Sequence, residues 1–288
     1  MTNLQDKPAS SAKAMNKLSA YISMLTIWLC VSHASAQATI SADSTKVTTS
    51  MFTLDAGYGS QRDTYVSPIA YDGPHFRVAY ANMCRNHASR WCRIMEGGID
   101  YELTHNPAGN HTMHALLADF KWAGMRSWSN VPWQKFAVMV GPMAQFRGGV
   151  LYNTNNSNNV VSARINVAAG VNAMASYSAT LWKRDITLNY EMSLPVVGAF
   201  FSPEYDEAYY EIYVGNRKNL AHFGWWGNRF DITNYLYADY AIGANTVLRI
   251  GYRNRIESSN VCHITTRAFS HSLVIGIGCN LMSTKKRK

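Results

Sequence analysis

Apolar and polar residues alternate with a period of two through almost the whole chain beyond residue 50. In a clear example, Ile165, Val167 and Val171 fall on one face, while Arg164 and Asn166 fall on the other. Residues two apart share a face only in an extended strand. Because no helical stretch interrupts the pattern, the polar face needs an interior and the apolar face needs lipid, which is typical of a transmembrane β-barrel.

Eleven segments carry this alternation: 52–59, 76–80, 95–103, 116–122, 135–147, 164–172, 186–192, 210–214, 230–240, 248–252 and 269–281. Bacterial single-chain barrels normally have an even number of strands, so a twelfth strand is expected near 61–72 or 195–229. The predicted fold class is therefore all-β, an antiparallel transmembrane β-barrel of about 12 strands. It is expected to occupy residues 51–282 as a single domain.

Residues 1–36 are expected to be a cleaved signal peptide. Lys17 supplies a positive charge, residues 22–31 are mostly apolar, and Ala34-Ser35-Ala36 offers a small-residue cleavage site. The apolar segment is about ten residues, too short to cross a bilayer as a helix. A lipoprotein signal at Cys30 is the alternative, but the residues before it lack the small side chains that such a site requires.

The remaining flanks are polar. Residues 37–50 are expected to form a polar lead-in, and residues 283–288 a basic tail. No segment after the signal peptide approaches the roughly 18 consecutive apolar residues of a membrane helix. Part of the formal net charge of +9 lies in that tail, so the body is only mildly basic and nucleic acid is not expected as a partner.

Composition favours the membrane without deciding it. Hydrophobic residues make up 47% of the chain, yet lumen-facing residues cancel lipid-facing ones in any averaging window. A soluble β-barrel or sandwich would have the same average. Many of the aromatic residues lie near strand ends, as in the two aromatic girdles of a membrane barrel, so we expect a bacterial outer-membrane location and a monomer.

Four cysteines follow the signal peptide: Cys84, Cys92, Cys262 and Cys279. Cys84 and Cys92 flank a polar connection where a hairpin disulfide is geometrically possible in an oxidising compartment, although nothing in the sequence fixes the pairing. The Cys and His spacings do not suggest zinc. The histidines at 105, 111 and 114 are interpreted as loop and interface residues, so neither a metal nor a cofactor is expected.

One motif is more distinctive than the composition. The stretch 194–205 reads LPVVGAFFSPEY and continues through Tyr209-Tyr210-Glu211-Ile212, and the chain also carries YNTNNSNN at 152–159. Together with Pro68-x-x-Tyr71-x-Gly73-Pro74, these segments resemble a family of uncharacterised secreted proteins from Bacteroidota, a domain of unknown function. The resemblance covers about residues 50–281 and implies an outer-membrane barrel without an established activity. The motif residues are Pro195, Gly198, Phe201, Pro203, Tyr205 and Tyr210.

Lipid hydrolysis is the enzymatic alternative. The outer-membrane phospholipase family is also a barrel and carries a Tyr-x-His-x-Ser-Asn-Gly motif, in which His is the base for the Ser nucleophile. Ser157-Asn158 would match its Ser-Asn, but Asn155 then occupies the His position, and an amide cannot accept the serine proton. We therefore expect no enzyme activity, and interpret this segment as loop-forming.

Charged residues on the polar faces give the remaining hypothesis. They would line a pore or form a compensating ion-pair network, since unpaired interior charge is costly. The leading function is a non-enzymatic outer-membrane protein, either structural or a narrow channel for small solutes, and a periplasmic ligand-binding β-barrel is the further alternative. The candidate lumen-lining residues are Glu96, Asp100, Glu102, Arg147, Arg164, Glu191, Asp231, Arg249 and Arg253.

Overall fold

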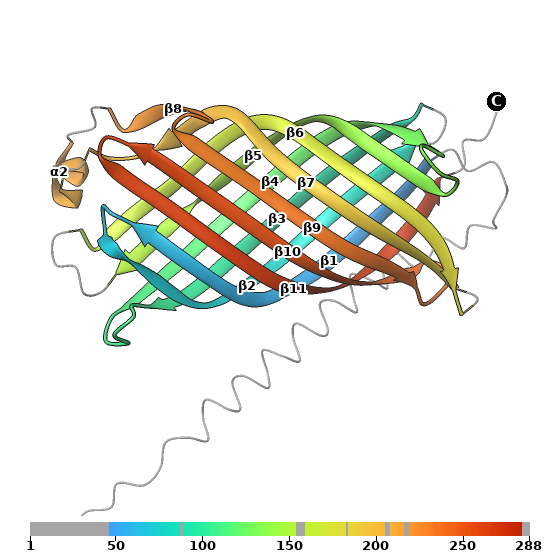
Figure 1. Ribbon diagram of the computed structural model, residues 1–288, viewed down its shortest axis with the longest axis horizontal. Coiled ribbons are helices and arrows are strands. Elements are labelled where there is room, and N and C mark those ends of the chain that lie inside the picture. Colours follow the sequence, from blue (N-terminus) through green and yellow to red (C-terminus); the bar gives the residue numbers. More distant parts are fainter. Residues whose placement is uncertain are drawn as a thin grey trace, which may run out of the picture. The chain divides into compact units, whose positions relative to one another are not determined.

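The computed structural model describes residues 46–86, 89–153, 159–182, 184–204, 208–215 and 219–283. The expected signal peptide, Cys30, Ser157, Asn158 and Tyr205 lie outside these residues, as does nearly all of the basic tail. The elements are β1 (Lys46–Asp63), β2 (Ser67–Asn86), β3 (Trp91–His105), β4 (Thr112–Ser129), β5 (Phe136–Asn153), β6 (Val161–Leu181), β7 (Arg184–Phe201), α2 (Tyr209–Val214), β8 (Ala221–Trp225), β9 (Arg229–Ala241), β10 (Thr246–Val261) and β11 (Ile264–Ser283) (Figure 1).

Ten of these strands close into a barrel. Each pairs antiparallel with its neighbours, β1 pairs with both β2 and β11, and β7 links β6 to β9. The predicted antiparallel barrel is therefore confirmed. Closure leaves no continuous free edge, so backbone groups along the wall are satisfied within the sheet.

The expected count of twelve strands is wrong. No separate strand fills 61–72, because β1 and β2 extend into this region and leave only a tight turn between them. Residues 210–214, expected to be a strand, form most of α2, which Glu211 caps by accepting a hydrogen bond from the Ala208 amide at 3.2 Å. Among the described residues, no helix is long and apolar enough to cross a membrane.

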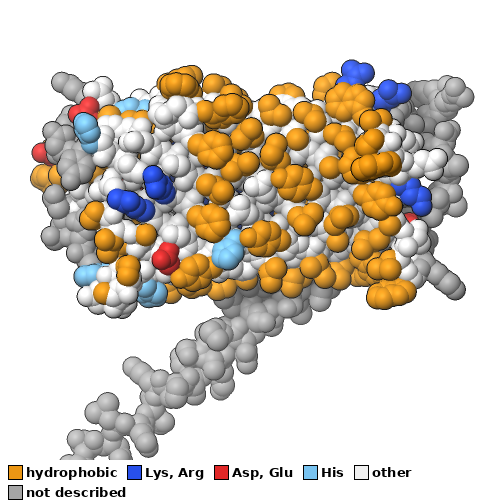
Figure 2. Space-filling view, in the orientation of Figure 1, with side chains coloured by type: hydrophobic (Ala, Val, Ile, Leu, Met, Phe, Trp, Pro, Cys, Tyr) orange, Lys and Arg blue, Asp and Glu red, His pale blue; other side chains and the backbone are white. Residues whose placement is uncertain are grey.

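The wall is apolar outside and polar inside. Leu54, Ile99, Ile250, Leu273 and Ile275 each leave more than half of the side chain exposed on the outer face. In the view of Figure 2, apolar side chains cover the middle of the barrel, and charged ones lie toward its two ends. An apolar outer face and a polar inner face are the reverse of the arrangement in soluble proteins, and they are typical of β-barrels that cross a membrane.

The barrel has two different ends. The first residue of β1 and the last of β11 lie at what we call the terminal end, together with the β2–β3, β4–β5, β6–β7 and β9–β10 connections. The opposite, distal end carries α2 and the longest connection, from β7 to β8 (Figure 1). The β1–β2, β3–β4, β5–β6 and β10–β11 connections are also distal.

A bulge in β7 changes its partner along its length. Gly170 pairs with Pro195 and Ala169 with Val197, so Val196 is an extra residue. Proline has no amide hydrogen for a ladder, and the β7–β9 pairing ends just before it, at Ser193. Beyond the bulge, residues 197–201 pair with β8 instead of β9. The strand β8, which lies in the expected range 195–229, is thus attached to the wall along one edge only.

The one-sided attachment of β8 makes it the weakest strand of the sheet. Strands with few paired neighbours open locally at low free energy, so we expect amides of 221–225 to exchange with solvent deuterium at least about tenfold faster than those of β1. Hydrogen–deuterium exchange with mass spectrometry on the detergent-folded protein measures this. Equal protection of β8 and β1 would contradict the single-edge pairing.

Candidate functional site

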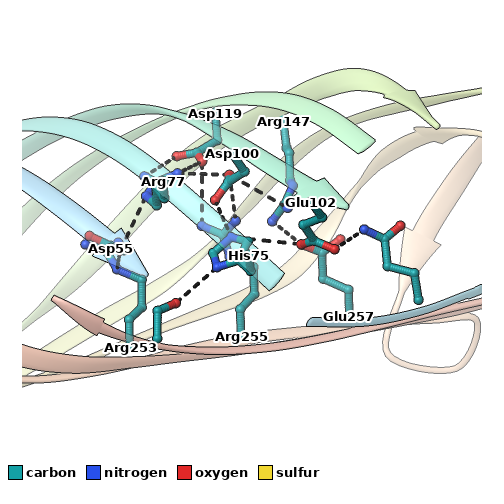
Figure 3. A network of polar contacts seen from close by, with 12 residues as sticks. Asp55, His75, Arg77, Asp100, Glu102, Asp119, Arg147, Arg253, Arg255 and Glu257 are labelled. Atoms are coloured by element: carbon teal, nitrogen blue, oxygen red, sulfur yellow. Dashed lines mark hydrogen bonds and ion pairs between the residues drawn. The ribbon is translucent and has the colours of Figure 1, made fainter. Parts of the chain in front are cut away.

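Ion-paired side chains fill the middle of the barrel, where the alternation of ten strands points their charged residues inward (Figure 3). Ion pairs link eight carboxylates to five arginines, one lysine and His75. We call this set the central network: Asp55, His75, Arg77, Glu96, Asp100, Glu102, Asp119, Lys121, Arg147, Glu191, Arg229, Asp231, Arg253, Arg255 and Glu257.

Arg77 of β2 is the most connected of these residues. Its Nη1 donates to Asp100 Oδ2 at 3.0 Å, and its Nη2 donates to Glu96 Oε1 at 3.1 Å and to Asp119 Oδ2 at 3.0 Å. Asp55 Oδ2 lies 4.0 Å from Nε. The side chain is only 1% exposed. Gly98 provides the space, because a Cβ there would lie 2.5 Å from the guanidinium carbon.

Arg253 and Lys121 extend the network across the lumen. Arg253, on β10, places its Nε 2.9 Å from Asp55 Oδ2 and also pairs with Glu96 on β3. Lys121 Nζ donates to Glu191 Oε1 at 2.7 Å and lies 3.5 Å from Glu96 Oε2. Because β4 and β7 are not neighbours in the sheet, the Lys121–Glu191 pair spans the interior.

Toward the distal end the network continues through Arg147, Arg255 and Arg229. Arg255 Nη1 lies 3.3 Å from Asp100 Oδ2. Arg147 pairs with Glu257, and Arg229 Nε donates to Asp231 Oδ2 at 2.9 Å. Small cavities of about 30 Å³ border Arg147 and Glu257, each with room for about one water molecule.

A serine, a histidine and a carboxylate are also aligned inside the barrel. Ser272 Oγ lies 3.1 Å from His75 Nδ1, and His75 Nε2 lies 3.0 Å from Asp100 Oδ1. Ser272 is 3% exposed, so its hydroxyl group is buried within the wall of side chains that fills the lumen. The three side chains form a hydrogen-bond chain that joins β11, β2 and β3 inside the barrel.

Two apolar layers lie on either side of the central network. Near the terminal end, Met125, Met139, Met143 and Met174 pack with Tyr235 and neighbouring side chains in a cluster that we call the methionine layer. Near the distal end, Tyr65, Val66, Tyr71, Met113, Ala115, Leu151 and Ile264 form a second cluster, the distal cap. Each cluster therefore places apolar side chains between the central network and one end of the barrel.

All nine candidate lumen-lining residues lie on the inner face. Seven of them belong to the central network. The other two form separate pairs: Arg164 Nε lies 3.4 Å from Asp63 Oδ2, and Arg249 Nε donates to Asp239 Oδ1 at 2.7 Å. Arg249 also lies over the Tyr237 ring, 3.8 Å from its centroid.

Several network members were missed by the sequence analysis, including its most connected one. Arg77 lies between the outward-facing Phe76 and Val78, and Lys121 lies between Phe120 and Trp122. The alternation therefore contained the signal, since any charge between two outward apolar residues must point inward. It was overlooked because single charges in apolar segments stand out less than the clustered acids of β3.

The motif residues lie near the change of partner in β7. Pro195 occupies the bulge, and its carbonyl accepts a hydrogen bond from Trp226 Nε1 at 2.9 Å. Gly198 permits close approach to β6, because a Cβ there would lie 2.3 Å from the Val167 carbonyl oxygen. Phe201 ends β7, Pro203 follows it, and Tyr210 is exposed on α2.

The hairpin disulfide considered for Cys84 and Cys92 does not form. Cys84 pairs with Arg93 and Cys92 with Arg85, so the two cysteines occupy successive positions of the ladder. Successive positions point to opposite faces, and Cys92 packs in the methionine layer inside the barrel. Both thiols are free.

Comparisons with known proteins give a family but no activity. A sequence profile described as "Protein of unknown function (DUF3316)" matches residues 22–288. No curated protein matches the chain. The expected match to a family of unknown function is confirmed, while its Bacteroidota source stays a prediction.

The chain shows distant likeness to several solved structures. The transport unit of the autotransporter AIDA-I from Escherichia coli is 4% identical with a TM-score of 0.42, covering 88% of this chain and 94% of that one. The translocator domain of autotransporter NalP from Neisseria meningitidis is 11% identical with a TM-score of 0.36, covering 92% and 97%. A Pseudomonas aeruginosa FadL homologue is 8% identical with a TM-score of 0.22, covering 82% and 89%. Because these TM-scores are low, the evidence that this chain forms a barrel is its own strand pairing.

Replacing Arg77 should destabilise the barrel strongly. Arg77→Met leaves several buried carboxylates without their common partner, and removing one member of a buried ion pair typically costs about 3–5 kcal/mol. Guanidinium titration of the detergent-folded protein, followed by circular dichroism, measures the free energy of unfolding. Arg93→Met, at an exposed outward position, is the matched control and should change it little. Equal effects of the two substitutions would contradict the central role of Arg77.

Proposed function

This chain belongs to the DUF3316 family, and we propose that it is a non-enzymatic β-barrel of the bacterial outer membrane whose lumen is closed at rest. The observation that carries the proposal is the sequence of layers inside the barrel. The central network joins opposite walls, and the methionine layer and the distal cap cover it at either end. A barrel filled in this way serves as a stable membrane body rather than an open pore.

The membrane location is supported by the outer surface. Aliphatic side chains such as Leu54, Leu273 and Ile275 are 62–68% exposed at the middle of their strands. Aromatic side chains lie on either side of this band, with Trp91 and Trp128 toward the terminal end and Tyr101 and Tyr152 toward the distal end. Amphipathic aromatic rings favour the two membrane–water interfaces.

The orientation follows from the connections. Outer-membrane barrels have short periplasmic turns and longer extracellular loops. The connection with α2 and β8 lies at the distal end. We therefore place the terminal end in the periplasm and the distal end outside the cell.

A narrow channel for small solutes is the second candidate, and the cavities beside Arg147 and Glu257 favour it. The central network also holds two more carboxylates than arginine and lysine side chains, which would favour cations. The methionine layer would then be the barrier to passage. A channel requires this layer to move, whereas a structural barrel does not.

Bilayer conductance tests the closed lumen. We expect the wild-type protein in planar bilayers to give no stable open steps, because paired charges and two apolar layers fill the lumen. Steady wild-type conductance would contradict the proposal. The variant Met125→Ala/Met139→Ala/Met174→Ala removes bulk from the methionine layer, so long-lived open steps in it would support the narrow channel, and a silent but folded variant would support the structural barrel.

A charge on the outer band tests the membrane location. Leu273→Arg should destabilise the barrel folded in liposomes by about 2–4 kcal/mol, the cost of an arginine at the bilayer midplane. Urea titration followed by the heat-dependent shift of the folded band on a gel measures this. Trp182→Arg, at the terminal end, should cost about 0–1 kcal/mol. If Leu273→Arg has no effect and carbonate releases the protein from membranes, a soluble periplasmic ligand-binding barrel is the better description.

A further inference from the structure

A large cavity lies outside the central network, at the terminal end of the barrel. It has a volume of about 560 Å³, and we call it the terminal vestibule. Met139 and Cys92 of the methionine layer line its inner limit. Small-molecule sites commonly measure about 300–1,000 Å³, so a compact organic ligand would fit.

The charged side chains that border the vestibule all have the same sign. Arg85, Arg90 and Lys135 line it, and among its described lining residues there is no aspartate or glutamate. The rest of the interior is different, because there each inward-facing arginine described above contacts at least one carboxylate. The positive charge of the vestibule is therefore uncompensated, which attracts anions.

Arg85 projects into the lumen from β2 and has only neutral partners. Its Nη2 donates to Ser176 Oγ, on the far side of the lumen in β6, at 3.4 Å, and its Nε donates to Met83 Sδ at 3.3 Å. Among the described residues it forms no ion pair. A guanidinium has five N–H donors, so Arg85 retains donors for an oxyanion.

Backbone hydrogen bonds fix the main chain of the two other cationic residues, Arg90 and Lys135, at the rim of the vestibule. The Ser127 amide donates to the Arg90 carbonyl at 2.8 Å, and the Ser178 amide donates to the Lys135 carbonyl at 3.0 Å. Arg90 has φ 57° and Lys135 has φ 66°. This left-handed conformation is uncommon for such residues and favours glycine or asparagine, so the turns here carry cations at a cost in local conformational energy.

The remaining lining defines the ligand. Ser127, Ser129 and Ser178 bring hydroxyl groups to the vestibule, while Met139 and Cys92 offer an apolar surface beneath them. We infer that the terminal vestibule binds a small organic oxyanion, with its phosphate or carboxylate on Arg85 and its apolar part against the methionine layer. The inference depends neither on conduction through the lumen nor on the membrane location.

Isothermal titration of the full chain in non-ionic detergent, with phenyl phosphate as the probe, tests the site. Arg85→Ala should weaken binding about tenfold or more, since a hydrogen bond to a charged group contributes about 1.5–3 kcal/mol. Arg85→Lys should retain part of the affinity. Arg93→Ala, which removes the same charge from the outer face at the same end, should leave binding unchanged, and benzylammonium of similar size should not bind.

Three results would overturn the inference. They are the absence of phenyl phosphate binding to the folded wild type, equal losses in Arg85→Ala and Arg93→Ala, and equal binding of benzylammonium. A second measurement does not require binding: in a chain with its other cysteines replaced by serine, Ser178→Cys should react severalfold faster with an anionic than with a cationic methanethiosulfonate. Arg85→Ala should reduce that preference, because it removes one of the three cations that line the vestibule. An equal rate with both reagents in the chain that retains Arg85 would contradict the cationic vestibule.

Discussion

The structure depends on the pairing of Arg77 with carboxylates from three neighbouring strands. A ten-stranded barrel is wide enough for side chains but leaves little room for water between them, so charges that face inward must find partners among the other inward-facing side chains. Asp55, Asp100 and Asp119 approach the same guanidinium from β1, β3 and β4. Their mutual repulsion is reduced because that cation lies among them, together with Arg253 and Arg255.

This constraint divides the interior by polarity. Where the charges are paired, the lumen is polar and filled. Toward both ends the inner face changes to methionine, tyrosine and aliphatic side chains, and these apolar surroundings strengthen the ion pairs. Among the inward-facing arginines that the structure describes, Arg85 has no carboxylate partner, and it lies beside the methionine layer in the terminal vestibule, where solvent or a ligand can reach it. The terminal end is thus the part of the interior where an uncompensated positive charge is available to bind a ligand.

Much of the architecture could be predicted from the sequence, and the misses have physical causes. Alternation identified the inner and outer faces, because side-chain direction in a strand depends on parity alone. The alternation predicted a strand at 210–214 because five residues alternate equally well on one turn of helix. The strand count was also wrong because the bulge at Pro195 reverses the parity of β7. The nine charges were placed inside, but their partners could not be predicted, since pairing across a lumen depends on the shear of the whole barrel.

The pairing of β1 with β11 also bears on how the chain reaches its native state. Asp55 lies in the first strand and Arg253 in the tenth, yet their charged groups meet at 2.9 Å. Contacts between such distant parts of the sequence require most of the chain entropy to be lost before they form, which slows folding. Until the last strand is in place, the carboxylates around Arg77 lack part of their compensation and β1 has an open edge. Closure of the sheet and neutralisation of its interior are therefore expected to be one cooperative, late event.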